Sequence, residues 1–199
     1  MPPKHTPILL FALFLIALSC NQSPEKSPEP GINLQEYGDT TFFNSFFRPK
    51  LDLMQLKDLR DGYDSLQFRV WFHSAFTDSA DVFIIKKEPH QNWSSCKIRF
   101  PIEATSTQFG YEKINNTRGE EIWSKLNQSG INTFKGQDID AMKRHCDGEI
   151  AIFEIATKSS YRICSSHSSV AYPSGRESEE EQLATTYMGY LFSFWLHPR

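Results

Sequence analysis

The segment Leu66–His73 constrains the fold most, because apolar side chains occupy every second position in it. Side chains alternate between the two faces of a β-strand, so this pattern predicts a half-buried antiparallel strand. The apolar face would carry Leu66, Phe68, Val70 and Phe72, and the opposite face Gln67, Arg69, Trp71 and His73. The fold should therefore contain a sheet with one face packed on a core.

Further strands are predicted on both sides of a polar central region. Val82–Lys87 and Trp93–Phe100 follow as the next two strands, and Cys96 shares a face with Ile98 and Phe100. Ile150–Ala156 and Tyr161–Ser165 form a hairpin that follows the turn signal Asp147-Gly148. The sequence thus indicates an antiparallel sheet of about five strands.

Two helices complete the expected fold. Capping-box spacing at Thr117–Glu120, followed by apolar residues and Gly130, predicts a short amphipathic helix. Apolar residues with helical spacing predict a C-terminal helix over about 179–196. The fold class is therefore α+β, with the C-terminal helix packed on one face of the sheet. We expect the clustered Phe42, Phe43, Phe46 and Phe47 to pack onto the same core rather than to enter a membrane.

The first residues have the pattern of an export signal. Lys4 precedes an uninterrupted apolar run from Ile8 to Leu18, which is too short to span a bilayer but suits a signal peptide. The run ends in Ala17-Leu18-Ser19-Cys20. This junction resembles the lipobox of bacterial lipoproteins, although Ala17 stands where Leu is usual. The resemblance implies cleavage before Cys20, lipid attachment at Cys20 and a location in the cell envelope, at the outer membrane or periplasmic face.

This resemblance divides the chain into three parts. Residues 1–19 would be the signal peptide, 20–32 a lipidated cysteine with a flexible tether, and 33–199 a single α+β domain. Pro, Ser and Glu dominate 21–31, a composition that cannot bury a core. The formal net charge of −3 gives no support for binding of nucleic acid.

The remaining cysteines allow one disulfide in an oxidising compartment. Cys96, Cys146 and Cys164 are left once Cys20 carries lipid. We predict a Cys146–Cys164 disulfide and a free, buried Cys96, with no metal and no cofactor. The alternative is a zinc site formed by His145, Cys146, Cys164 and His167, although adjacent His145 and Cys146 could hardly ligate one ion together.

Glu154 is the candidate functional acid. It shares a predicted strand face with Ile150 and Ile152, where an unpaired charge would be unfavourable. Glu154 could be a carboxylate in a pocket, or it could form an ion pair with an arginine. The arginines available for such a pair are Arg69, Arg99 and Arg162.

The segment from Asp147 to Pro173 is similar to a pattern of small uncharacterised bacterial proteins. The likeness consists of Asp147-Gly148, Glu154, Tyr161-Arg162 and Tyr172-Pro173. It implies an α+β fold and assigns no catalytic residue.

The leading functional hypothesis is a membrane-tethered, non-enzymatic binding or interaction module with an envelope partner. The alternatives are a small envelope hydrolase that uses Glu154 or a histidine, and a zinc-binding protein. An enzyme should gather several polar groups in one concave pocket, which distinguishes these classes.

Overall fold

A computed structural model describes residues 31–38, 40–90, 92–103, 110, 112–136, 148–168 and 179–196 of the chain. Nearly all of them belong to one compact unit, Ile32–Arg199. The predicted signal peptide and Cys20 lie outside the described residues. No helix in the described ranges is long and apolar enough to cross a membrane.

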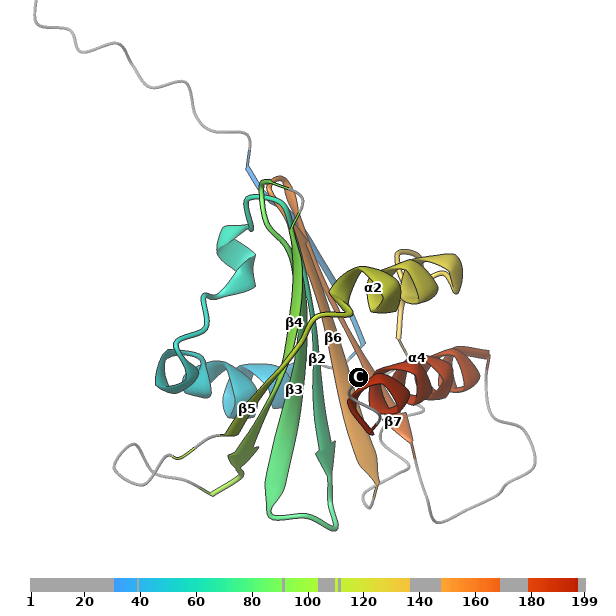
Figure 1. Cartoon of the computed structure of the whole chain (residues 1–199). Helices are drawn as coiled ribbons and strands as arrows, with labels where there is room; N and C mark the ends of the chain where they lie inside the picture. The colour runs from blue at the N-terminus through green and yellow to red at the C-terminus, as the bar shows by residue number, and fades with distance from the viewer. Residues whose placement is uncertain are drawn as a thin grey trace, which may run out of the picture. The chain divides into compact units, whose positions relative to one another are not determined.

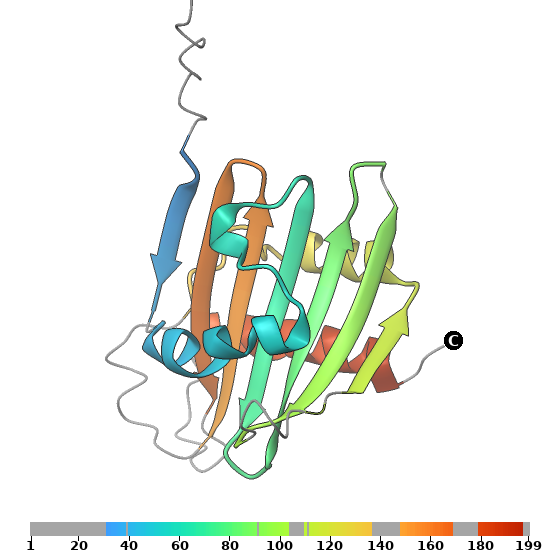
Figure 2. The ribbon, with the colours of Figure 1, turned by 90° about the vertical axis from the view of Figure 1, so that its left-hand side faces the viewer.

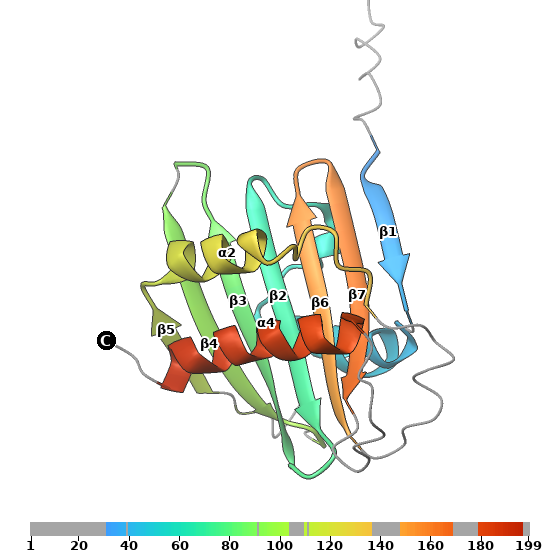
Figure 3. The same ribbon diagram turned by 90° about the vertical axis from the view of Figure 1, so that its right-hand side faces the viewer.

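The unit is built on a seven-stranded sheet with the strand order β1-β7-β6-β2-β3-β4-β5 (Figures 1 and 3). The strands are β1 (Asn33–Tyr37), β2 (Leu66–Ser74), β3 (Ser79–Lys87), β4 (Trp93–Pro101), β5 (Glu112–Asn116), β6 (Glu149–Thr157) and β7 (Ser160–Ser168). Neighbouring strands are antiparallel except for β1, which pairs with β7 in parallel. The predicted α+β class with a C-terminal helix is confirmed, but the prediction of about five strands is wrong.

The missed strands are the two edges, β1 and β5. Both are short, and their sequences, NLQEY and EKINN, lack the apolar alternation that identified the inner strands. The side chains of β1 are largely exposed, so burial imposes no pattern on them. Edge strands of this kind give little hydrophobic signal in a sequence.

One face of the sheet is covered by two helices (Figure 3). They are α2 (Gly119–Gln128) and α4 (Glu179–Leu196), as their apolar spacing predicted. Leu191 and Phe194 of α4 are buried in the core beneath. The N-terminus of α2 has no side-chain cap, so the predicted capping box is not formed, whereas Gly130 does follow the helix with a φ of +87°.

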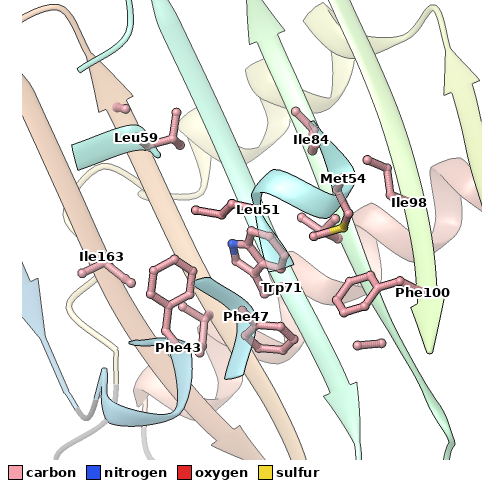
Figure 4. Close-up of a cluster of buried hydrophobic side chains, with 14 of the residues drawn as sticks. Phe43, Phe47, Leu51, Met54, Leu59, Trp71, Ile84, Ile98, Phe100 and Ile163 are labelled. Atoms are coloured by element: carbon pink, nitrogen blue, oxygen red, sulfur yellow. The ribbon is translucent and has the colours of Figure 1, made fainter. Parts of the chain in front are cut away.

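The opposite face is covered by a chain of short helical turns that precedes β2 (Figure 2). The turns are η1 (Phe43–Phe47), η2 (Arg48–Lys50), η3 (Asp52–Met54) and η4 (Leu59–Asp61). Phe43 and Phe47 pack against Trp71 of β2, with ring centroids 5.8 and 5.1 Å away (Figure 4). The phenylalanine cluster therefore belongs to the core, as predicted. We call this side of the sheet the η-covered face.

The η turns also correct the interpretation of β2. Its polar side was expected to meet solvent, yet Gln67, Arg69 and Trp71 are all buried. The strand is thus covered on both faces rather than half-buried. The sequence alternation was real, but the layer over the second face comes from a segment with no regular periodicity.

Candidate functional site

Glu154 lies on the η-covered face, near the middle of β6. It is 1% exposed, and both oxygens of its carboxylate accept a hydrogen bond. Trp71 Nε1 donates to Oε2 at 2.5 Å, and Tyr161 Oη donates to Oε1 at 2.9 Å. The donors come from the strands on either side, β2 and β7, so the sheet register itself places them around the carboxylate.

Arg69 is the residue directly opposite Glu154 on β2. Its side chain is also 1% exposed. With the Gln67 amide oriented so that its oxygen accepts, Arg69 Nε and Nη2 donate to that oxygen at 3.0 and 3.2 Å. Nη1 is buried and has no hydrogen-bond partner within the described part of the chain. The pair thus consists of two opposite charges removed from water at the same level of the sheet.

Burial and mutual attraction act in opposite directions on this pair. Burial raises the pKa of Glu154, while the charge of Arg69 and the hydrogen bonds from Trp71 and Tyr161 lower it. Burial lowers the pKa of Arg69, and the charge of Glu154 raises it. Burial and the adjacent Glu154 together raise the pKa of Tyr161, which therefore stays protonated and acts as a donor.

These contacts favour a structural role for Glu154. A general acid or base must reach its substrate, and this carboxylate is covered and already holds two donors. Of the arginines considered from the sequence, Arg69 is the one that faces Glu154. Arg99 instead pairs with Asp81 at 2.8 Å, and Arg162 donates to the backbone carbonyls of Ile131 and Asn132 after α2.

A cavity lies away from Glu154, at the end of the sheet where β2 ends, and the residues that line it form no motif in the sequence. Its volume is about 680 Å³. We call it the sheet-end cavity, and it is lined by His73, Ala75, Thr77, Asp78, Pro101, Ile102 and Glu103. These residues come from the end of β2, the β2–β3 turn and the end of β4.

Backbone contacts join the walls of this cavity. Ile102 N donates to Asp78 O at 3.0 Å, which links the end of β4 to the β2–β3 turn. Thr77 N donates to Ser74 O at 3.0 Å within that turn. The positions of Asp78 and Glu103 are thus set by strand pairing, a long-range relationship that no local sequence motif announces.

His73 forms part of the wall nearest the η turns. Its ring stacks near Phe42 and Phe46, with centroids 6.1 and 6.2 Å away. Nδ1 is buried without a hydrogen-bond partner in the described ranges. Burial lowers the pKa of His73, so the imidazole is neutral at pH 7.

The cavity contains two acidic side chains that have no polar partner among the described residues. Asp78 and Glu103 are both exposed, and neither side chain has a hydrogen bond or an ion pair to another described residue. No lysine or arginine is found among the described lining residues. The cavity therefore presents negative charge, a neutral imidazole and the apolar surfaces of Ala75, Pro101 and Ile102.

The cysteines are only partly described. Cys96 and Cys164 are buried, and neither is bonded to another described cysteine; burial raises the pKa of the Cys164 thiol to about 12. Cys146 and His145 lie outside the described residues, so the predicted disulfide stays a prediction. Among the residues that the structure describes, no three His, Cys, Asp or Glu side chains are grouped to hold a metal ion.

A comparison of the chain with known protein families and with curated proteins finds no match. The function is therefore inferred from the geometry and chemistry of the site.

Proposed function

We propose that this protein is a lipid-anchored, non-enzymatic binding module of the bacterial cell envelope. The sheet-end cavity is its ligand site. The observation that carries the proposal is the size and chemistry of this cavity. Ligand pockets typically have volumes of roughly 300–1,000 Å³ and combine apolar walls with a few polar groups. At about 680 Å³, the sheet-end cavity falls within this range, and its lining combines acidic side chains with the apolar surfaces of Ala75, Pro101 and Ile102.

The place of the cavity suits a protein held by its N-terminus. The described chain starts beside the β6–β7 turn, where Asn33 N donates to Ser159 O at 2.9 Å. That turn lies at the end of the sheet where β2 begins (Figure 2). The residues that line the cavity lie at the other end, where β2 ends. The length of β2 puts about 26 Å between the two ends, at roughly 3.3 Å per residue. Strand β1 therefore begins at the end of the sheet opposite to the cavity.

The buried state of Glu154 makes a hydrolase that uses this residue the weaker candidate. Its carboxylate is enclosed by Trp71, Tyr161 and the η turns. The sheet-end cavity offers a histidine and two acids, but no Ser, Cys or Lys nucleophile among its described lining residues, and the Thr77 hydroxyl is hydrogen-bonded to the backbone carbonyls of Ser74 and Ser79. A binding role needs only the shape and charge of the cavity.

The anchor is tested by expression of the full chain in a bacterial host. Wild-type protein should fractionate with membranes and carry a lipid-modified Cys20 as its first residue, as measured by intact mass and peptide mass spectrometry. Cys20→Ser should abolish the modification and release the chain or stop its processing. A mature wild-type chain without lipid would contradict the anchored part of the proposal.

The binding role is tested with a variant that fills the cavity without deleting a native side chain. Ala75 is exposed in the β2–β3 turn and lines the cavity, so Ala75→Trp should occlude it. Ser124→Trp, at an exposed position of α2, adds the same bulk to the other face. Small molecules are screened by thermal shift on the solubilised full chain. Compounds that stabilise the wild-type protein should no longer stabilise Ala75→Trp and should still stabilise Ser124→Trp. Binders unaffected by Ala75→Trp would show that the cavity is not the site.

A further inference from the structure

We infer that the ligand of the sheet-end cavity carries an ammonium group attached to an apolar body. This inference rests on the proposed function, because it names the chemical class that the cavity would bind. It draws on the charge of the cavity, the apolar part of its lining and its size.

The charge favours a cation. Asp78 and Glu103 contribute two carboxylates, and neither is neutralised by a described side chain. His73 adds no positive charge at neutral pH, because its ring is partly buried against Phe42 and Phe46. An anionic ligand would meet like charge on both acidic walls, and a cation would be attracted to them.

The apolar lining favours a cation that is organic. Ala75, Pro101 and Ile102 contribute hydrocarbon surface to the same lining as the two acids. Phe76 lies in the same turn, between Ala75 and Thr77, and is 71% exposed. An exposed aromatic ring of this kind can pack on the apolar part of a ligand or on its cationic group.

The size of the cavity argues against a bare metal ion as its occupant. A calcium ion needs six to eight oxygen ligands close around it, and the described lining supplies two carboxylates in about 680 Å³. The same volume accommodates a ring and an aliphatic amine. A hydrogen-bonded ammonium group can contact a carboxylate while the rest of the ligand covers the apolar wall.

The test uses three small molecules that share one ring and differ in charge. Benzylamine is the cation, benzyl alcohol its neutral counterpart and benzoate the anion. Each is titrated into isotope-labelled, solubilised full chain, and the amide NMR signals of Thr77 and Ile102 are followed at measured free ligand concentration. Benzylamine should shift these signals saturably, benzyl alcohol should bind about tenfold more weakly, and benzoate should not bind.

Matched variants assign the effect to the acids. Asp78→Asn and Glu103→Gln should each weaken benzylamine binding about threefold, and the double variant about tenfold, while benzyl alcohol binding stays unchanged. Glu120→Gln removes the same charge from an exposed position on α2 and should leave both affinities unchanged. The three changed positions, Asp78, Glu103 and Glu120, carry exposed side chains, and thermal unfolding of each variant checks that the fold is intact.

The outcomes separate this inference from the proposed function. One outcome is that benzylamine and benzyl alcohol bind equally well, and that their binding is lost with Ala75→Trp but kept with Asp78→Asn and Glu103→Gln. That result would support a ligand-binding cavity and overturn its preference for cations. Tighter binding of benzoate, or no saturable shift with benzylamine, would overturn it as well. A wider screen in which no compound binds the wild-type protein would instead contradict the proposed function.

Discussion

Arg69 and Glu154 face each other across β2 and β6 as directly paired residues, and each is about 99% buried. Neither charge is exposed to water, so each depends on the other and on the fixed donors and acceptors around it. Trp71 and Tyr161 supply donors to the carboxylate, and Gln67 supplies an acceptor to the guanidinium group. The pair therefore joins β2, β6 and β7 beneath the η turns.

This arrangement predicts strong coupling between the two charges. Glu154→Gln alone should lower the free energy of unfolding by about 3–5 kcal/mol, because it leaves Arg69 buried without a counter-charge. Arg69→Met alone should cost a similar amount. The double variant should lose much less than the sum, since no unpaired buried charge remains. Urea denaturation of the four proteins measures the coupling, and additive losses would show that the two residues act independently.

His73 predicts a specific dependence of stability on pH. Burial lowers its folded-state pKa below the 6.5 of the unfolded chain, so in this range the unfolded chain binds more protons. The contribution of His73 should be complete above the unfolded value and be lost as the pH falls through the folded value. Relative to His73→Gln, wild-type protein should therefore lose stability as the pH falls below about 6.5. Parallel pH profiles for the two proteins would contradict this.

The inner part of the fold was predictable because burial imposes periodicity on the sequence. The inner strands β2, β3, β4, β6 and β7 and the helix α4 repeat their apolar residues at the spacing of their own geometry. The edges β1 and β5 carry no such repeat, since little of their surface is buried. The η turns fill irregular space and share no single period.

The candidate site was predictable only in part. Glu154 stood out because a carboxylate on an apolar strand face needs a partner, and Arg69 was one of three arginines considered. The choice among them depended on strand register, which only the folded sheet fixes. The sheet-end cavity could not be predicted, because Asp78 and Glu103 are brought to the same end of the sheet by the β3–β4 pairing and belong to no local motif.

The contact between the two helices predicts a large effect at Phe194. Its ring is buried, and Arg118 and Lys125, at and within α2, lie 4.2 and 4.9 Å from its centroid. Phe194→Ala should cost about 3–5 kcal/mol, because it opens a cavity and removes these cation–π contacts. Ser193→Ala changes the adjacent exposed position and should cost less than about 1 kcal/mol. Chemical denaturation gives both values, and equal stabilities would contradict the packing of α4.

The thiols of Cys96 and Cys164 should be unreactive while the protein is folded. Both are buried, and burial raises the pKa of each, to about 12 for Cys164. The thiolate is the reactive form, so iodoacetamide at pH 8 should label neither cysteine in the folded chain.

After denaturation without reductant, iodoacetamide should label Cys96 in full. Peptide mapping at that step decides the pairing: an unlabelled Cys164 linked to Cys146 establishes the predicted disulfide, and a labelled Cys164 rejects it. Rapid labelling of either residue before denaturation would show that its strand opens, contrary to the burial seen in the sheet.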